Sequence, residues 1–430
     1  MKKILFLTPE LPYPPVSGGK LKSWKLVEFL SQQYGLTVAA VLKENDEEHV
    51  EKFLARVKLE SFLSAPVKVP RSIGNLLKSF YQRIPLNVFR TYSKCFMSEV
   101  SHVIHDYDMV IADHYEVFQY IPSNYQGKVV LHEHNAYYLM WERFAKSPDQ
   151  NIAKRLVSYI ESLRVKRYER NACHRADLVF ASPNDIDSLA LIGVDRNKCR
   201  YTYHLGDDSQ LQLPTLSFEQ TTKTLLYVGS LRWEANVDGL LWFFKAVWPT
   251  LKKSNADLAL TIIGKDPDPR LIDATEPLSG IVFEGFVENL EPFFQRSRVA
   301  IAPLRFGAGM KVKVLSSMCR GIPTVTTSIG SEGMDFESMT HLTVADNPEN
   351  MVKLIERLLV EKELWEHLKQ GRAWMGMVCN RSKNGDYYWV EANVTPVYIN
   401  GRVDEFLSVR YAPDRQQISA AEDLYQQLNA

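Results

Sequence analysis

The sequence predicts two consecutive doubly wound α/β domains, followed by a small antiparallel β meander and a helix. Short apolar runs alternate with amphipathic helical stretches over most of the 430 residues. This alternation is typical of parallel sheets that helices cover on both faces. A polar stretch at residues 205–223 interrupts the alternation once, and after about residue 365 the pattern changes to β-rich runs joined by Asn-Gly.

The first domain is predicted at residues 1–205, with helices at Lys20–Gln33 and Ile152–His174. Its buried strands are expected at Ile4–Leu7, Thr37–Leu42, Met109–Ala112, Val129–Leu131 and Leu178–Ala181. A linker at 206–222 leads to a second domain at 223–366, with strands at Thr224–Val228, Leu258–Ile263, Ile281–Glu284, Val299–Ala302 and Thr324–Thr327. Ligands of such folds bind at the carboxyl ends of the strands, so we expect a cleft between the two domains.

The last segment, residues 367–430, has the pattern of a meander. Asn384-Gly385 and Asn400-Gly401 separate three β-rich runs, and this dipeptide is a strong hairpin signal. The runs are Trp374–Arg381, Tyr387–Tyr398 and Val403–Tyr411, and a helix is predicted near Gln416–Gln427. We therefore predict a module boundary near residues 364–371.

Composition excludes several classes of protein. Apolar residues make up 45% and charged residues 24%, which is ordinary for a globular protein. Lys+Arg and Asp+Glu are both 51, whereas a nucleic-acid binder normally carries a basic excess. The five cysteines are dispersed and form no CxxC pair, so we predict reduced thiols and no metal site.

The N-terminus does not have the pattern of a secretory signal. Its apolar core is only Ile4–Leu7 before Pro9 follows, which is too short for the apolar region of a signal peptide. No run of 18 apolar residues occurs, so no transmembrane helix is expected. The sequence predicts a cytoplasmic protein.

The segment Arg305–Pro323 has the pattern of a phosphate-binding turn. It follows an apolar strand, and Gly307 and Gly309 allow a tight turn into a helix predicted to start near Met310. The first N–H groups of a helix carry partial positive charge, to which Lys311 and Lys313 add full charges. The alternative is a plain strand-to-helix turn with solvated lysines.

A second glycine turn, Ser17-Gly18-Gly19, precedes the helix predicted at Lys20 in the first domain. It lacks the GxGxxG spacing of a dinucleotide fold, and an ordinary turn is its alternative interpretation. Because both glycine turns face the same predicted cleft, we expect Gly18 and Gly19 to bracket one anion together with Gly307 and Gly309.

Several motifs in succession resemble family 4 of the GT-B glycosyltransferases over about residues 1–365. The motifs are PELPYPPVSGGK (9–20), HEHN (132–135), YVGSLRWEANVDGLLWF (227–243), TIIGKDPD (261–268), VFEGFVENLEPFF (282–294), APLRFGAGMKVKVL (302–315) and GIPTVTTSIGSEGM (321–334). The resemblance implies that the second domain holds a nucleotide-sugar and that the first receives the acceptor.

The chain departs from the family at four donor-binding positions. Ala308 and Ser316 stand where the family has paired glutamates, and Ser230 and Ala235 stand where it commonly has arginine and lysine. The diphosphate is then expected to depend on Lys311, on either Arg232 or Arg305, and on backbone N–H groups. The candidate donor-binding residues are Gly18, Gly19, Ser230, Arg232, Arg305, Gly307, Gly309, Lys313 and Glu332, with Glu332 as the carboxylate nearest to a lost sugar contact.

His134 and Lys311 are the candidate catalytic residues. His134 follows the strand Lys128–Leu131, and a histidine near this position contacts the transferred sugar in the family. Its alternatives are a satisfied surface histidine or a metal pair with His132, although no further ligands with suitable spacing are apparent. Asp113-His114 follows another strand and is placed similarly.

Residues 71–98 contain five basic residues and no acidic residue among many apolar ones. Such a stretch either lies on an anionic membrane or covers the sheet as an ordinary amphipathic helix. Peripheral contact with the inner face of the membrane is therefore one prediction for this chain.

The tail WMGMVCNRSKNGDYYWVEANVTPVYINGRVDEFLSVR (374–410) resembles the C-terminal half of a PAS domain of aerotaxis-type receptors. The elements that would complete a cofactor pocket are not in the chain, so no flavin is expected, and sheet packing is the alternative role for Trp374 and Trp389.

The resemblances together imply a retaining hexosyltransferase that uses a nucleotide-diphosphate sugar and a hydroxyl acceptor on a glycolipid or polysaccharide. The alternatives are a sugar-nucleotide epimerase on the same fold and an inactive or sensory scaffold with a PAS-derived tail.

Overall fold

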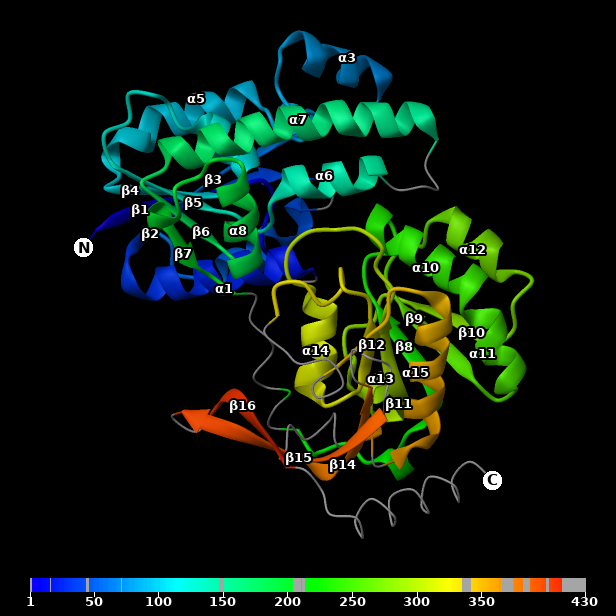
Figure 1. Ribbon diagram of the computed structural model, residues 1–430. Helices are drawn as coiled ribbons and strands as arrows, with labels where there is room; N and C mark the ends of the chain where they lie inside the picture. The colour runs from blue at the N-terminus through cyan, green and yellow to red at the C-terminus, as the bar shows by residue number, and fades with distance from the viewer. Residues whose placement is uncertain are drawn as a thin grey trace.

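The computed structural model describes two parallel α/β domains and a separate antiparallel sheet (Figure 1). It describes residues 2–15, 17–43, 46–70, 72–146, 151–203, 210, 213–334, 342–362 and 364–365, and the backbone alone of 374–381, 387–399 and 402–411.

The first domain contains a seven-stranded parallel sheet in the order β3-β2-β1-β4-β5-β6-β7. The strands are β1 (Lys3–Thr8), β2 (Gly35–Leu42), β3 (Ser61–Pro66), β4 (Met109–Asp113), β5 (Lys128–His132), β6 (Leu178–Ala181) and β7 (Cys199–Tyr201). The helices are α1 (Gly18–Gln33), α2 (Val50–Leu54), α3 (Ile73–Tyr81), α4 (Leu86–Arg90), α5 (Lys94–Val103), α6 (Tyr137–Lys146), α7 (Ile152–Arg175) and α8 (Pro183–Leu191), with 3-10 turns at Glu47–His49, Ile104–Asp106, Tyr115–Tyr120 and Arg196–Lys198.

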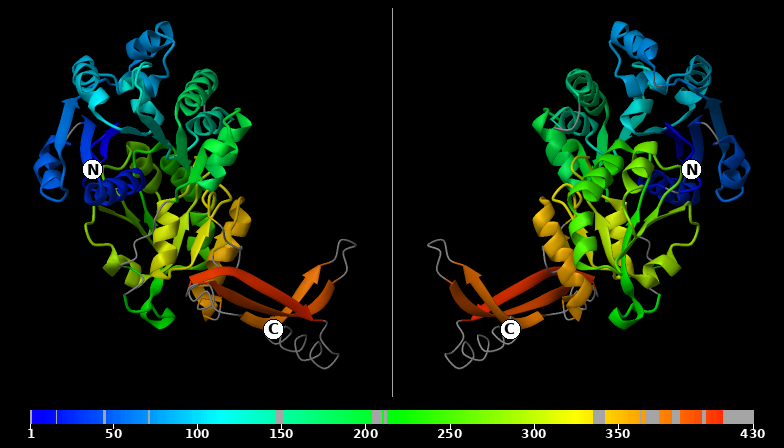
Figure 2. Two further views of the ribbon diagram at one scale, coloured as in Figure 1. Left: turned by 90° about the vertical axis from the view of Figure 1, so that its left-hand side faces the viewer. Right: turned by 90° about the vertical axis from the view of Figure 1, so that its right-hand side faces the viewer.

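The continuous apolar runs are explained by burial of both faces of this sheet. Leu5 and Leu7 of β1 belong to one core cluster, whereas Ile4 and Phe6 belong to the cluster on the opposite face. Successive side chains of a strand point to opposite faces, so a strand covered on both sides must be apolar throughout. Figure 2 shows helices on both sides of each of the two sheets.

The second domain has a six-stranded parallel sheet in the order β10-β9-β8-β11-β12-β13. The strands are β8 (Thr222–Val228), β9 (Ala259–Ile263), β10 (Ile281–Gly285), β11 (Ser297–Ala302), β12 (Thr324–Thr326) and β13 (Thr343–Val344). The helices are α10 (Glu234–Ala246), α11 (Trp248–Ser254), α12 (Pro269–Thr275), α13 (Glu291–Arg296), α14 (Val312–Arg320) and α15 (Pro348–Val360), and a 3-10 turn at Phe218–Gln220 precedes β8.

The two doubly wound domains predicted from the sequence are confirmed. The first sheet ends at Tyr201 and the second begins at Thr222, on either side of the predicted linker. The sequence prediction missed β3, β7 and β13, which are short or lie at sheet edges and lack a long apolar run. Trp365 is fully buried in the second domain, where its Nε1 donates to the carbonyl of Arg298 at 2.6 Å.

The predicted meander is present as a three-stranded antiparallel sheet, β14 (Trp374–Arg381), β15 (Tyr387–Ile399) and β16 (Arg402–Tyr411). The Asn-Gly turns and the helix predicted near 416–427 lie outside the described residues.

Candidate active site

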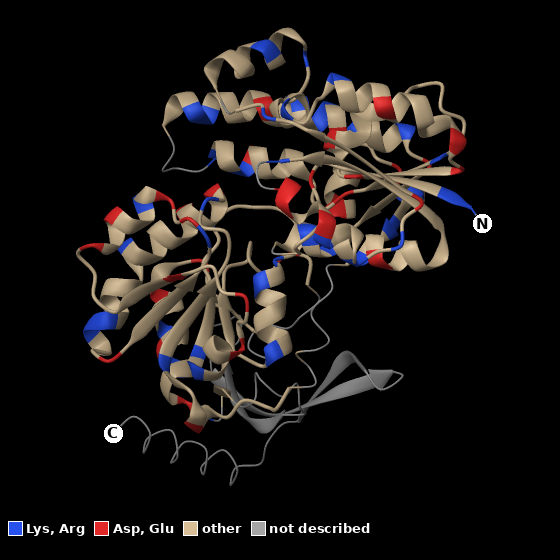
Figure 3. Cartoon of the chain, turned by 180° about the vertical axis from the view of Figure 1, so that it is seen from behind, with Lys and Arg blue, Asp and Glu red and all other residues tan. Residues whose placement is uncertain are grey.

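A cavity of about 2680 Å³ lies between the two domains and is lined by residues of both. Its walls come from the segments that follow β1, β2, β4 and β5 in the first domain and β8, β9, β10 and β11 in the second. All these strands are parallel, so their carboxyl ends open to this cleft, as the sequence predicts. Figure 3, which colours the backbone by residue type, shows acidic and basic residues of the first domain on the side that faces the second.

Two helix N-termini, one from each domain, meet at this cavity. Helix α1 begins at Gly18, and its N-cap Ser17 accepts a hydrogen bond from the Lys20 N–H at 3.3 Å. Helix α14 begins at Val312 instead of near Met310. A Cβ atom at Gly18 would lie 2.7 Å from the Cγ2 of Val312, so only glycine permits this approach. Both helix starts therefore present positive dipole ends to the same space.

The turn before α14 needs both of its glycines. Gly307 has φ 148° and Gly309 has φ 70°, values that favour glycine. A Cβ at Gly309 would also lie 1.7 Å from the side-chain amide of Asn135 in the first domain. The Asn135 amide donates to the Ala308 carbonyl at 3.0 Å, which fixes the turn against the opposite domain.

Lys311 and Lys313 lie at the start of α14 and both line the cavity. Lys311 donates to the carbonyls of Ala308 and Gly309, and burial lowers its pKa to about 8. Lys313 donates to the Tyr227 hydroxyl at 2.8 Å, and burial together with the charge of Lys311 lowers its pKa to about 7. The desolvated cations lose most of this penalty when an anion binds beside them.

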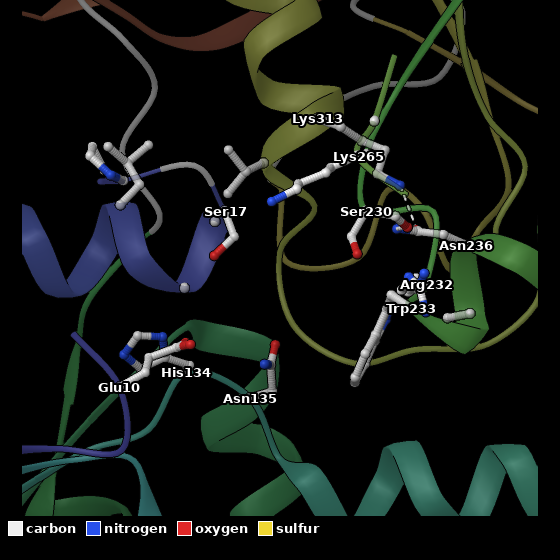
Figure 4. A pocket seen from close by; sticks show the side chains of 18 of the residues that line it. Glu10, Ser17, His134, Asn135, Ser230, Arg232, Trp233, Asn236, Lys265 and Lys313 are labelled. Atoms are coloured by element: carbon white, nitrogen blue, oxygen red, sulfur yellow. Dashed lines mark hydrogen bonds between the residues drawn. The ribbon is translucent and has the colours of Figure 1, made fainter. Parts of the chain in front are cut away.

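The loops after β8 and β9 supply a further part of the second-domain wall, as Figure 4 shows. Ser230 and Arg232 line the cavity as predicted, and the Ser230 carbonyl accepts from the amide of Asn236 at 2.8 Å. Trp233 and Lys265 also line the cavity and were missed by the sequence prediction. Trp233 lies in the motif at 227–243 and Lys265 in the motif at 261–268, each shortly after a predicted strand. That position is the signal by which the sequence could have identified them as cavity residues.

His134 is held by a buried carboxylate on the first-domain side. Its Nε2 lies 2.8 Å from the Oδ1 of Asp113, and the Nδ1 of His132 lies 2.8 Å from the same oxygen. Burial alone would raise the pKa of Asp113, but His134 and the two imidazole hydrogen bonds hold it well below its usual range. The other carboxylate oxygen accepts from the Ser23 hydroxyl at 2.6 Å. The ionised carboxylate therefore fixes both rings as donors.

Burial lowers the pKa of His134 well below its usual range, and it lowers that of His114 to about 4. The two rings stack with centroids 3.8 Å apart. His134 is 1% exposed, so the surface-histidine alternative is wrong. The ring still lines the cavity, where a Cβ at Gly19 would lie 3.6 Å from its Nδ1. At neutral pH His134 is a neutral, oriented imidazole beside the start of α1.

Asp113, His132 and His134 form a cluster with the atom types of a metal site, which the sequence spacing did not reveal. The cluster arises because β4 and β5 are neighbours in the sheet. Its imidazole–carboxylate contacts of 2.8 Å are hydrogen-bond distances. By comparison, two ligand atoms that each lie about 2.0 Å from one tetrahedral zinc ion are roughly 3.3 Å apart. The shorter contacts of 2.8 Å therefore match hydrogen bonds better than zinc ligation.

Arg305 and Glu332 do not line the cavity, in contrast to the sequence prediction. Arg305 pairs with Asp238 of α10 at 2.6 Å. Glu332 accepts two hydrogen bonds from Arg143 of α6, at 2.5 and 2.7 Å, and Arg143 also donates to the Gly307 carbonyl at 2.6 Å. Glu332 therefore joins the two domains. The sequence prediction placed it wrongly because the sequence could not show that an arginine of the other domain reaches it.

The first-domain side of the cavity carries charged residues that the sequence prediction missed. Glu10 and Lys43 form an ion pair of 3.0 Å after β1 and β2, and Glu116 lies beside them after β4. Burial raises the pKa of Glu116. These residues come from separate strands, so only the sheet order brings them together.

Within the stretch 71–98, the described residues include α3, α4 and the start of α5, of which α4 and α5 contribute to the first-domain core. Val88 and Phe96 are fully buried in the first-domain core, whereas Ile73, Leu77 and Tyr81 on α3 are exposed. Among the described residues, no helix is long and apolar enough to cross a membrane.

Residues 222–361 match the family model of the group 1 glycosyl transferases, and residues 337–410 match that of the PAS fold. The second domain is therefore a group 1 glycosyl transferase domain. A curated relative, an uncharacterised 44.6 kDa protein in the cps region of Klebsiella pneumoniae, is 24% identical over 81% of this chain and 88% of its own length. The Escherichia coli aerotaxis receptor is 44% identical over 68 residues, which is 16% of this chain and 13% of the receptor.

Solved structures share the fold of both domains. Anabaena HepE in complex with UDP and glucose has a TM-score of 0.61 at 14% identity, covering 86% of this chain and 93% of that one. A point mutant of Staphylococcus aureus TarM, in complex with fondaparinux, α-GlcNAc-glycerol and UDP, has a TM-score of 0.62 at 11% identity, covering 86% and 95%. The two-domain GT-B fold predicted from the sequence is confirmed.

Proposed function

We propose that this chain, with its group 1 glycosyl transferase domain at 222–361, moves a hexose from a nucleotide-diphosphate sugar to a hydroxyl group. The observation that carries the proposal is the meeting of two helix N-termini at one cavity, with Lys311 and Lys313 beside them. A diphosphate is the part of such a donor that this positive, partly desolvated site fits best. HepE and TarM, which share the fold, are described in complex with UDP.

The donor lies, in this proposal, with its diphosphate at the start of α14 and its sugar toward His134. As the bond to the sugar breaks, negative charge grows on the diphosphate, and the helix dipole and Lys311 stabilise it in place. The Asp113 carboxylate keeps His134 in one orientation, so that the neutral ring can hydrogen-bond a sugar hydroxyl without reorganising.

The reaction is proposed to retain the configuration of the sugar. The departing phosphate oxygen then takes the proton of the acceptor hydroxyl, so no protein base is needed on the acceptor side. The acceptor is a glycolipid or polysaccharide hydroxyl that enters from the first-domain side, past Glu10, Lys43 and Glu116. Contact with an anionic membrane surface belongs to the same proposal.

A thermal-shift screen against UDP-, GDP- and ADP-sugars identifies the donor, and release of the nucleoside diphosphate then measures turnover. Lys311→Ala is expected to lower kcat by about 10²- to 10³-fold, the loss typical of one preorganised charge partner. Lys253→Ala, which removes an exposed lysine at the end of α11, is the matched control and should leave kcat unchanged. Equal kcat in the Lys311→Ala variant and the control would show that the site is wrongly assigned.

A sugar-nucleotide epimerase is the second candidate, because Glu10 and Glu116 place carboxylates in the cavity wall. Burial raises the pKa of Glu116, which is the direction of shift expected for a carboxyl group that transfers a proton. Proton NMR of the donor incubated without any acceptor separates the two functions. An epimerase converts the donor to a second sugar-nucleotide, whereas a transferase leaves it intact or hydrolyses it slowly.

A further inference from the structure

Two helices on the outer side of the first domain expose rows of large apolar side chains. On α3, Ile73, Leu77 and Tyr81 are 79%, 64% and 90% exposed. Their spacing of four residues places them on one side of the helix. On α7, four of the five exposed large apolar residues follow one another at spacings of four, three and four, which also forms one row: Ile152, Leu156, Tyr159 and Leu163. The fifth, Val157, is 37% exposed and lies outside this row. The seven residues of the two rows are called the α3/α7 face.

The two rows belong to adjoining helices, which Figure 1 shows at the top of the first domain. Arg164 of α7 donates to the Ser79 carbonyl of α3 at 2.7 Å, and its guanidinium lies 4.2 Å from the centre of the Phe80 ring. Large exposed apolar patches on a soluble domain usually mark an interaction surface.

The exposed charged residues on the two helices themselves are of one sign. Helix α3 carries no acidic residue, and the two acids of α7, Glu161 and Glu169, are 1% and 0% exposed. The exposed charged residues of the two helices are all basic: Lys78, Lys154, Arg155, Lys166, Arg167, Arg170 and Arg175. An apolar row flanked only by cations fits an anionic lipid surface.

The cavity between the domains extends to the same face. Five apolar residues of the segment from Val67 to Leu86 line it, namely Val67, Val69, Ile73, Leu76 and Leu86, and Ile73 is also a member of the α3/α7 face; this part of the lining is called the apolar arm. Arg90 and Asn87 line the cavity next to this arm. A hydrocarbon chain that lies in the arm would carry a polar head group toward the catalytic centre.

We propose that the α3/α7 face docks on an anionic bilayer and that the apolar arm there admits a lipid-anchored acceptor. This inference rests on the proposed function and specifies its acceptor as membrane-bound. The sequence predicted a membrane-binding surface within residues 71–98. Of that stretch, the α3/α7 face includes only residues of α3, and it adds residues of α7. A second copy of the chain fits the face less well, because a symmetric contact would bring together two pairs of helices whose own exposed charges are all basic.

The test uses co-sedimentation of the full chain with vesicles of phosphatidylcholine alone or with about 30% phosphatidylglycerol added. We expect at least about tenfold stronger partitioning to the anionic vesicles, decreasing as salt rises. The double variant Leu77→Glu/Leu156→Glu should lose at least about tenfold of this binding. Leu191→Glu is the matched control, because Leu191 is 84% exposed on α8, outside the face.

Equal binding to neutral and anionic vesicles would overturn the proposal. A concentration-dependent dimer in sedimentation velocity that the double variant abolishes would also overturn it, because the face would then be an interface between copies. Circular dichroism of each variant confirms that it is folded.

A separate measurement distinguishes this inference from the proposed function. In the double variant, slow hydrolysis of the nucleotide-sugar in solution should be unchanged, while turnover with an acceptor lipid extract held in vesicles should fall. If no nucleotide-sugar is bound or hydrolysed, the proposed function fails, and vesicle binding still decides the docking surface. If hydrolysis in solution and turnover in vesicles both fall in the double variant, the substitutions affect the catalytic site itself, and the docking proposal is wrong.

Discussion

Raising the pH should weaken the binding of a nucleoside diphosphate, because the two cavity lysines titrate near neutrality. Burial lowers the pKa of Lys311 to about 8 and that of Lys313 to about 7. A bound diphosphate favours the charged form of each lysine and so raises both pKa values. Above these values the protein must take up protons to bind, and its affinity must decrease as the pH rises.

The size of the effect follows from the fraction of charged lysine in the free protein. With a pKa of about 8, Lys311 passes from roughly nine-tenths charged at pH 7 to roughly one-tenth at pH 9, a loss of about tenfold. With a pKa of about 7, Lys313 passes from roughly one-half to one-hundredth, a loss of about 50-fold. Together they set an upper limit on the order of 500-fold between pH 7 and pH 9.

Isothermal titration calorimetry with UDP, and with GDP or ADP if UDP does not bind, measures this dependence. Repeating each titration in two buffers of different ionisation enthalpy counts the protons taken up. Lys311→Arg should remove the roughly tenfold part of the pH dependence that Lys311 contributes and leave that of Lys313, since arginine stays charged throughout. Lys253→Ala should leave the whole dependence unchanged. An affinity that stays within about threefold from pH 7 to pH 9, with no proton uptake, would refute the reasoning.

Two further predictions concern the contacts that hold the site together. Arg143→Ala removes the bidentate pair with Glu332 and should open the cleft, weakening nucleotide binding by about tenfold or more. A larger radius of gyration in X-ray scattering would accompany this loss, whereas Lys146→Ala on the same helix, whose partner is the neighbouring Glu142, should change neither. Asp113→Asn removes the charge that accepts from both imidazoles and should cost about 3 kcal/mol of stability, or roughly 6–12 °C in Tm. An unchanged Tm by scanning calorimetry would contradict the assigned hydrogen bonds.

The sequence by itself determined the architecture, because the period of its apolar residues is a local property. A strand such as β2, with every residue buried, must be covered on both faces, and six of its eight residues, Thr37–Leu42, were predicted as a buried strand from the sequence without any partner. The glycines that start α1 and α14 were also readable, because positive φ and close approach require glycine wherever they occur.

Only the tertiary structure decided which polar residues share the site. The Asp113 carboxylate meets His134 because β4 and β5 are adjacent in the sheet, and the separation of 21 positions along the chain carries no sign of that contact. Glu332 was expected at the donor sugar, yet Arg143 holds it from the other domain. Long-range contacts of this kind depend on sheet order and on how two domains close, and neither is encoded in the local pattern from which a sequence is read.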